Sequence, residues 1–247
     1  MTGPDTRLWH TVGRSLVRHP WRWTFALLLP LIIFPVIDIT VSGWFYDPEA
    51  RIFPARVDPF FEWWRKSMPY YLFAVVIYVI ALWAAGEWLK DAVFGVTRRV
   101  AAYLVLSLAL GPGLVVNVIL KDSWGRPRPS TILEFGGPNY FVPPLVITDQ
   151  CDSNCSFSSG HGALGFWPVA FALLAPPRWR PHAIAAALAF GAMVGFVRIA
   201  QGGHFLSDVA FSAVITVGII WWLYRRMIRP GDAASPKNNA PEGGESP

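Results

Sequence analysis

The amino-acid sequence predicts an all-α membrane protein with six transmembrane helices. Hydrophobic residues make up 53% of the 247 positions and charged residues only 15%, whereas soluble domains average about 25% charged residues. The mean hydropathy is +0.38. The chain also holds 13 tryptophans, and indole rings collect at membrane–water interfaces. These observations exclude a soluble enzyme and a disordered chain.

Six apolar runs predict the transmembrane helices. The hydrocarbon core of a membrane requires about 20 helical residues, with a range of about 17 to 25. Four runs meet that length comfortably, and the run from His161 meets it only if the preceding residues join the helix. The runs are Thr24–Phe45, Pro69–Leu89, Val100–Leu120, His161–Ala175, Ala183–Ala200 and Phe205–Tyr224. The first run is too long for a secretory signal and lacks a small-residue cleavage site, so we expect a retained anchor.

Positive charge predicts how these helices are oriented. Arginine and lysine accumulate in four segments that fall on one side of a six-helix layout, and that side is cytoplasmic by the positive-inside rule. The residues are Arg7, Arg14, Arg18, Arg22, Lys90, Arg98, Arg99, Arg178, Arg180, Arg225, Arg226 and Arg229. The net charge of +5 therefore bears on topology rather than on nucleic acid. Both termini would be cytoplasmic, and the loop Lys121–Ser159 and the turn Gln201–His204 would face outward.

We expect a single membrane-embedded domain over residues 1–230. Within it, residues 1–23 predict a cytoplasmic amphipathic segment, because apolar side chains fall near one helical face. These side chains are Leu8, Trp9, Val12, Leu16 and Val17. A second amphipathic stretch, on the outer leaflet, is suggested by Phe60, Phe61, Trp63 and Trp64, and a simple aromatic anchor is the alternative for both. Residues 231–247 are rich in Pro, Gly, Ser, Asn and Glu, which predicts a disordered cytoplasmic tail.

A cluster of cations directly follows the third apolar run. It contains Lys121, Arg126 and Arg128, with only Asp122 nearby and two prolines that stiffen the backbone. The arginine fork matches phosphate oxygens, and lysine adds a point charge. The alternative is a basic belt at the membrane surface. Because such belts favour the cytoplasmic side and this cluster is predicted outside, the cluster indicates an anion site.

A second cluster lies at the start of the fourth run and contains Ser159, Gly160 and His161. A Ser-Gly turn that enters a helix presents backbone N–H groups and the positive end of the helix dipole to an anion. His161 would lie on the first turn, where it can donate or accept a proton. An ordinary serine N-cap followed by an interfacial histidine is the structural alternative.

The third cluster links the last two runs and contains Arg198, His204 and Asp208. His204 and Asp208 are four residues apart and share a face on a helix. A carboxylate beside an imidazole fixes its tautomer and leaves the other ring nitrogen as base or nucleophile. Gly202-Gly203 allows a tight turn in front of that nitrogen. A purely structural His–Asp pair is the alternative, which the nearby Arg198 disfavours.

Together the three clusters resemble the motifs of the type 2 phosphatidic acid phosphatase superfamily, which includes membrane lipid phosphatases and soluble vanadium haloperoxidases. The matching residues are Lys121, Arg128 and Pro129, then Ser159, Gly160 and His161, then Arg198, His204 and Asp208. Ser158 stands where the family usually has Pro, and Val197 where it usually has Ser. Neither departure removes an expected catalytic group, although the change at Val197 would loosen the phosphate cage.

The resemblance implies a metal-independent phosphatase without a cofactor, with its active site at the periplasmic ends of the helices. His204 would attack phosphorus and become a phosphohistidine, with Asp208 orienting it and His161 protonating the leaving alkoxide. The resemblance assigns the phosphate oxygens to Lys121, Arg128, Arg198 and the amides near Ser159 and Gly160. Arg126 would be a secondary substrate contact or a supporting residue.

Cys151 and Cys155 lie in the outward loop, where an oxidising periplasm favours a disulfide that would stiffen the approach to His161. A zinc half-site with His161 is the alternative. The run from Cys151 to His161, with Phe141 and the residues after it, resembles the bacterial branch that dephosphorylates lipid A.

The sequence therefore predicts a multi-pass inner-membrane phosphatase whose partners are the membrane and a phosphorylated lipid, with lipid A favoured. Phosphatidylglycerophosphate, phosphatidic acid, undecaprenyl pyrophosphate and a lipid phosphotransferase remain alternatives, and the oligomeric state is not indicated. A catalytically inactive lipid transporter or scaffold is the alternative from a different class. A transporter predicts polar residues scattered at mid-span, whereas here only a few, such as Asp38 and Asn117, lie away from one membrane face.

Overall fold

The computed structural model describes residues 20–229, and the regular structure in that range is helical. The helices are α2 (Pro20–Ile33), α3 (Val36–Gly43), α4 (Pro54–Val57), α5 (Pro59–Leu89), η1 (Val93–Gly95), α6 (Arg98–Leu108), η2 (Ala109–Leu120), α7 (Lys121–Ser123), η3 (Pro129–Thr131), η4 (Leu133–Phe135), α8 (Gly160–Phe166), α9 (Val169–Leu174), α10 (Arg180–Ala200) and α11 (Leu206–Met227). Most of the predicted amphipathic segment 1–23 and the whole predicted tail 231–247 lie outside the described residues.

Four helical segments within residues 20–229 are long and apolar enough to cross a membrane. They are α5, α6 continued by η2, α10 and α11. A fifth is counted if the bent pair α2 and α3 is taken as one span. The all-helical membrane fold is therefore confirmed, while the predicted number of six spans is not reached by length and composition alone.

The first apolar run was predicted as one helix over Thr24–Phe45, and this prediction is wrong. The chain bends by 90° between α2 and α3. The break falls at Phe34 and Pro35, because proline lacks the N–H that a continuous helix requires and its ring collides with the preceding turn. The bend carries α3 into the bundle, where Asp38 is only 1% exposed.

The fourth run is also shorter than a full span. It forms α8 and α9, interrupted at Trp167 and Pro168. With 1.5 Å per residue, the 15 residues of Gly160–Leu174 extend about 22 Å, less than the hydrocarbon thickness of about 30 Å. The pair instead packs inside the bundle, where Phe166 of α8 lies directly against Gly191 of α10. A Cβ atom at Gly191 would lie only 2.5 Å from Cε1 of Phe166, so a larger residue would not fit there. Such small residues allow membrane helices to approach closely.

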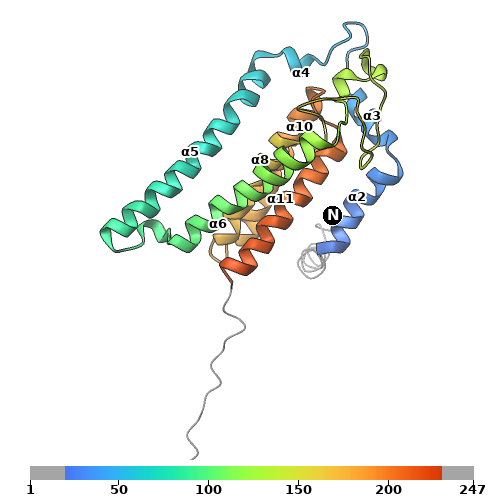
Figure 1. Cartoon of the computed structure of the whole chain (residues 1–247). Helices are drawn as coiled ribbons and strands as arrows, with labels where there is room; N and C mark the ends of the chain where they lie inside the picture. The colour runs from blue at the N-terminus through green and yellow to red at the C-terminus, as the bar shows by residue number, and fades with distance from the viewer. Residues whose placement is uncertain (1–19, 230–247) are drawn as a thin grey trace, which may run out of the picture.

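Helix α5 stands apart from the rest of the bundle (Figure 1). Its first turn is capped by Asp58, which accepts hydrogen bonds from the amides of Phe60 (2.9 Å) and Phe61 (3.1 Å). The aromatic stretch at its start, for which an amphipathic surface stretch and a simple aromatic anchor were both considered, is the beginning of a 31-residue helix that continues through Pro69. Only 6% of its most apolar window is buried, so its side chains are available to lipid.

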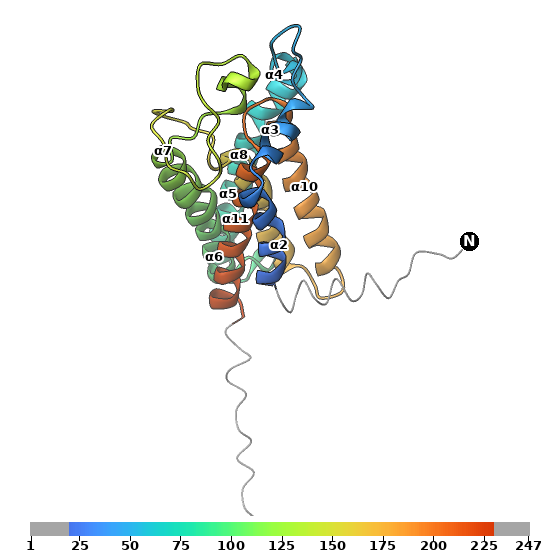
Figure 2. The ribbon, with the colours of Figure 1, turned by 90° about the vertical axis from the view of Figure 1, so that its right-hand side faces the viewer.

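Helices α6, α8, α10 and α11 form the centre of the fold, and α8 packs against α10 and α11. The core there includes Tyr103 and Trp167, whose polar atoms bond to the Ala170 carbonyl (3.2 Å) and the Ser107 hydroxyl (3.0 Å). Figure 2 shows that α3, α4 and the long loop after α7 gather at one end of this bundle. The turn between α10 and α11 lies at the same end, so the residues of the three predicted polar clusters lie there.

Candidate active site

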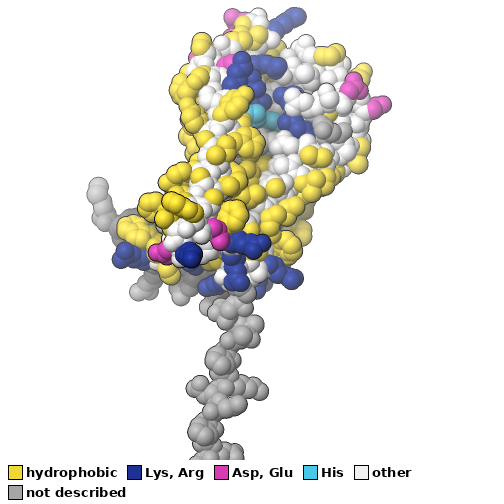
Figure 3. All heavy atoms as spheres, turned by 60° about the vertical axis from the view of Figure 1, so that its left-hand side comes forward, with side chains coloured by type: hydrophobic (Ala, Val, Ile, Leu, Met, Phe, Trp, Pro, Cys, Tyr) yellow, Lys and Arg dark blue, Asp and Glu magenta, His cyan; other side chains and the backbone are white. Residues whose placement is uncertain are grey.

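The three polar clusters predicted from the sequence come together at this loop-bearing end of the bundle. They enter it from the loop after α7, the start of α8 and the turn between α10 and α11. Figure 3 shows Lys and Arg side chains and a His side chain gathered in a hollow above a long apolar surface. The arrangement combines a charged pocket with a surface suited to hydrocarbon chains.

His204 is fully buried in the turn between α10 and α11. Its Nδ1 lies 2.7 Å from the backbone carbonyl oxygen of Ser156. A carbonyl can only accept a hydrogen bond, so Nδ1 carries the proton and Nε2 of the neutral ring has a free lone pair. Nε2 is buried without a hydrogen-bond partner in the described structure. The ring therefore presents an unpartnered, unprotonated nitrogen.

The charges around His204 keep its ring neutral. Burial lowers the pKa of His204 well below the usual value, and the positive charges of Arg198, Arg128 and Lys121 lower it further. These are the same three cations that the sequence assigns to phosphate binding. The structure thus places all three close enough to His204 to act on its charge.

Asp208 does not orient His204 by the direct hydrogen bond that the sequence analysis expects. Its Oδ2 lies 3.9 Å from Nδ1 of His204, which is too long for a hydrogen bond. Oδ2 instead accepts from the Ser156 hydroxyl (2.5 Å) and from the Phe205 amide (2.8 Å). Asp208 therefore fixes Ser156, and the carbonyl of Ser156 fixes His204.

Arg126 is a fully buried supporting residue that joins two carboxylates. Its Nη1 lies 2.5 Å from Asp208, its Nη2 lies 2.9 Å from Asp38, and its Nε donates to the Val142 carbonyl at 2.8 Å. The Phe205 ring covers the guanidinium, with 4.3 Å from Cζ to the ring centroid. Because the side chain is fully buried and four of its five N–H groups donate to protein acceptors, Arg126 supports the site rather than contacting substrate.

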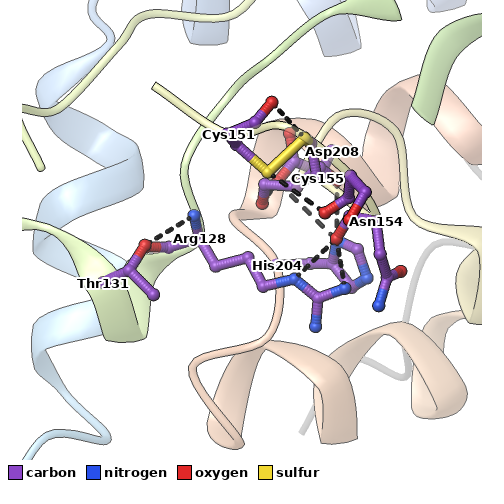
Figure 4. The surroundings of a disulfide bond; sticks show 9 residues. Arg128, Thr131, Cys151, Asn154, Cys155, His204 and Asp208 are labelled. Carbon is purple, nitrogen blue, oxygen red and sulfur yellow. Dashed lines mark hydrogen bonds and ion pairs between the residues drawn. A yellow bond between two sulfur atoms is a disulfide. The ribbon is translucent and has the colours of Figure 1, made fainter. Parts of the chain in front are cut away.

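Arg198 and Arg128 have no carboxylate partner within 4 Å in residues 20–229. Arg198 is 6% exposed, donates from Nη1 to the Gln201 side chain, and has an unpartnered Nε. Arg128 donates from Nε (3.1 Å) and Nη2 (2.6 Å) to the carbonyl oxygen of Asn154, beside His204 (Figure 4). Burial and the charge of Arg56 lower the pKa of Arg128. Asp208 is already paired with Arg126, so the pocket keeps an excess of positive charge that favours an anion.

The start of α8 has the form predicted from the Ser-Gly turn. Ser159 is the N-cap, and its hydroxyl accepts from the Gly162 amide at 3.1 Å. Its own amide donates to the Asp208 carbonyl at 3.3 Å, which leaves the Gly160 amide as the first helical N–H of this turn. His161 follows on the first turn, and its Nε2 lies 3.1 Å from the Arg65 carbonyl oxygen of α5.

Cys151 and Cys155 are joined by a disulfide, with an S–S distance of 2.19 Å. Their thiolates are therefore not available for the alternative zinc half-site with His161. No group of three or more His, Cys, Asp or Glu side chains in the described part of the chain is arranged to hold a metal ion. The loop that this bridge closes contacts Arg128 through Asn154 and, through the adjoining Ser156, His204.

Sequence reasoning did not assign a role in the site to three groups that support it. Asp38 could have been found from the sequence, because a lone carboxylate in a membrane helix is energetically costly and therefore indicates a buried partner. Ser156 and Asn154 act through backbone carbonyl oxygens, which no side-chain pattern reveals. Only the folded loop shows them.

The comparisons with known proteins agree on one family. The model of the PAP2 superfamily matches residues 100–231. The lipid A 4'-phosphatase of Francisella tularensis subsp. novicida (strain U112) is 38% identical over 211 residues, which cover 84% of this chain and 91% of that protein.

Two further relatives carry the same name. The lipid A 4'-phosphatase of Rhizobium leguminosarum is 35% identical over 207 residues, covering 76% of this chain and 86% of that protein. The one from Rhizobium etli (strain ATCC 51251 / DSM 11541 / JCM 21823 / NBRC 15573 / CFN 42) is 34% identical over 224 residues, covering 84% and 85%. No solved structure matches the chain.

Proposed function

The chain belongs to the PAP2 superfamily, and from this membership and the geometry of the site we propose that it removes the 4'-phosphate of lipid A. We place the reaction at the periplasmic face of a bacterial inner membrane. The observation that carries the proposal is the buried, unpartnered Nε2 of His204 among three cations. An imidazole lone pair that lies among cations able to hold phosphate oxygens suits attack on a phosphate ester.

In the proposed first step, Nε2 of His204 attacks phosphorus in line with the leaving sugar oxygen. The N–P bond forms, the P–O bond breaks, and the product is a phosphohistidine. The Ser156 carbonyl accepts the hydrogen bond from Nδ1–H throughout, so it stabilises the positive charge that develops on the ring. Lys121, Arg128, Arg198 and the Gly160 amide hold the equatorial oxygens. Catalysis of phosphoryl transfer depends mainly on such positioning and charge stabilisation.

His161 is the proposed acid that protonates the leaving oxygen and later activates water for hydrolysis of the phosphohistidine. Its position on the first turn of α8, two residues after the N-cap, supports this role. The hydrogen bond to the Arg65 carbonyl holds the ring against α5. Because the Arg65 carbonyl can only accept, Nε2 keeps its proton and Nδ1 is the nitrogen that exchanges one with substrate and water. His161 must therefore enter the first step as the imidazolium, give the Nδ1 proton to the leaving oxygen, and regain a proton at Nδ1 from the water that it activates in the second step.

We propose that the protein crosses the membrane six times. The bent pair α2–α3 would be the first span and the pair α8–α9, surrounded by other helices, the fourth. The placement of the connections supports this count. The segment between α3 and α5 and the loop between α7 and α8 lie at one end of the bundle, as six alternating spans require. Both termini would be cytoplasmic and the site periplasmic. Lipid would reach the site from the side, along the exposed apolar surface of α5.

The proposal is tested by phosphate release from purified lipids in detergent. The panel contains lipid A, phosphatidylglycerophosphate, phosphatidic acid and undecaprenyl pyrophosphate. We expect release from lipid A, with loss of the 4'-phosphate by mass spectrometry. Preference for another lipid would overturn the substrate, release only in the presence of a second lipid acceptor would indicate a phosphotransferase, and no release from any lipid would favour a scaffold.

The role of His204 is tested by trapping the intermediate. Rapid quench with phosphate-labelled lipid should give acid-labile, base-stable label on the wild type and none on His204→Ala. His182→Ala is the matched control, because His182 lies at the opposite end of the bundle, at the start of α10, and should keep both label and activity. Label on His204→Ala, or complete loss of wild-type activity in EDTA, would contradict the mechanism.

A further inference from the structure

One short loop supplies the contacts that hold two different parts of the site. Residues 151–155 form a ring closed by the Cys151–Cys155 disulfide, and Ser156 follows directly. The carbonyl oxygen of Asn154 accepts both hydrogen bonds from Arg128. Two residues later, the carbonyl oxygen of Ser156 accepts the hydrogen bond from Nδ1 of His204. Figure 4 shows the bridge, Asn154, Arg128 and His204 side by side.

The two carbonyls are anchored in different ways. Ser156 is fixed independently of the bridge, because its amide donates to the Arg126 carbonyl at 2.8 Å and its hydroxyl to Asp208 at 2.5 Å. Asn154 is exposed and adopts a left-handed backbone conformation with φ of 51°, a region that is rare for most residues but that Asn tolerates. Asn154 lies inside the disulfide ring, so the bridge is the covalent restraint on its carbonyl.

We propose that the disulfide-closed loop is a positioning element for the phosphate-binding Arg128. The inference rests on the proposed function, since it concerns how the phosphate is held. With the bridge closed, the Asn154 carbonyl fixes the guanidinium at a set place relative to His204. With the bridge open, Asn154 relaxes and Arg128 loses its fixed direction. His204 keeps its place, because Ser156 retains its own anchors.

This mechanism makes the effect of the bridge depend on Arg128. Two groups that act through one contact give non-additive effects when both are changed, whereas independent groups give additive ones. A bridge that only stiffens the fold would reduce activity equally whether or not Arg128 is present. If the bridge acts through Arg128, opening the bridge should have little effect on the activity of a protein that lacks this arginine.

The test is a double-mutant cycle with Cys151→Ser and Arg128→Ala in the full-length protein. Cys151 is the cysteine to change, because it is partly exposed and Cys155 is fully buried. On lipid A, we expect Cys151→Ser to lower kcat/KM by about tenfold or more in the wild-type background and less than about twofold in Arg128→Ala. Ser153→Ala, an exposed change in the same ring with the bridge retained, should behave like wild type.

Two further measurements separate the possible failures. Dithiothreitol should reduce the wild-type activity to the level of Cys151→Ser and leave that variant unchanged, and the Kd of inorganic phosphate should rise in parallel. Equal losses in both backgrounds, free thiols in the untreated wild type, or full activity after verified reduction would overturn the inference. Failure of the oxidised wild type to release phosphate from any lipid would overturn the proposed function instead, together with this inference.

Discussion

The Nδ1 atom of His204 lies 2.7 Å from the carbonyl oxygen of Ser156, and this contact defines which ring nitrogen is free. Asp208, the acid that the sequence pairs with this histidine, lies 3.9 Å from the same nitrogen. The carboxylate acts one step away, through the hydroxyl of Ser156 and through Arg126. The orientation of the nucleophile is therefore set by a chain of buried contacts rather than by one ion pair.

Asp208→Asn should impair the enzyme severely without abolishing turnover. The amide can still accept from Ser156 but no longer neutralises Arg126 at 2.5 Å. We expect kcat to fall by about 10²- to 10⁴-fold, less than in His204→Ala, which lacks the nucleophile. Phosphate release from lipid A by the two variants measures the difference. Turnover by Asp208→Asn as low as that of His204→Ala would show that the carboxylate acts on the ring more directly than its position indicates.

Asp38→Asn should weaken the fold and the activity together, although Asp38 touches no substrate. Asp38 accepts from Arg126 (2.9 Å) and from the Ser207 amide (2.9 Å). Loss of its charge leaves Asp208 as the one carboxylate paired with Arg126 in the described residues. Breaking a buried ion pair lowers the free energy of unfolding by about 3–5 kcal/mol. Thermal unfolding in detergent should show a lower Tm.

The control for this prediction is the exposed Asp91→Asn, which should change stability by less than about 0.5 kcal/mol. An unchanged Tm and kcat for Asp38→Asn would contradict the role of the Asp38–Arg126 pair.

Residue types and spacing identified the chemistry of the site but not its geometry. The cations and histidines of the three clusters were recognised because Arg, Lys and His next to membrane spans are costly and specific in what they bind. The contacts of Asn154 and Ser156 were not, because each acts through a backbone oxygen whose position depends on the fold of a 39-residue stretch, Lys121–Ser159. Asp38 was noticed as an exception, but its partner Arg126 is 88 residues away.

Run length predicted the long helices well and the interrupted ones poorly. For α10 and α11 the predicted starts and ends differ from the observed ones by no more than three residues. The first and fourth runs failed at Pro35 and Pro168, which a hydropathy window averages with their apolar neighbours. Proline removes a helical hydrogen bond wherever it falls after the first turn, but α2 continues through Pro30 and α5 through Pro69, so a proline in an apolar run does not by itself predict the break.

The activity should persist to lower pH than the ordinary titration of histidine would allow. The pKa of His204 lies well below the usual value of about 6.5, so the ring remains neutral and nucleophilic as the pH falls through that value. The acid limb of kcat/KM that belongs to this group should therefore lie well below the pH at which an ordinary histidine titrates. Removing a nearby cation should raise the pKa of His204, so in Arg128→Gln the limb should move to higher pH. A limb in Arg128→Gln at the same or a lower pH would contradict this account.

Impermeant thiol labelling should place the long loop outside the cytoplasm. Gly136 is exposed, but its φ of +78° makes it a poor site for cysteine, so Glu134→Cys, exposed in the same loop, is the better variant. In intact spheroplasts Glu134→Cys should react, while Arg178→Cys, at the other end of the bundle, should react only after lysis. The reverse pattern would overturn the proposed topology and the periplasmic location of the site.

Gly203→Ala should disable the site while leaving the fold intact. Gly203 lies one residue before His204, and a Cβ atom there would collide with Nη2 of Arg198 and lie 2.8 Å from its Cζ. The guanidinium, 6% exposed and bonded to Gln201, must then leave the place from which it would hold the phosphate. Loss of one such preorganised donor costs about 10²- to 10³-fold in kcat.

Gly218→Ala on α11 is the control for this prediction, because nothing lies within 4 Å of a Cβ atom there, and it should keep full activity. Phosphate release measures the effect, and an unchanged Tm for Gly203→Ala excludes unfolding as its cause. Wild-type turnover by Gly203→Ala would show that Arg198 does not bind the phosphate from the position it occupies.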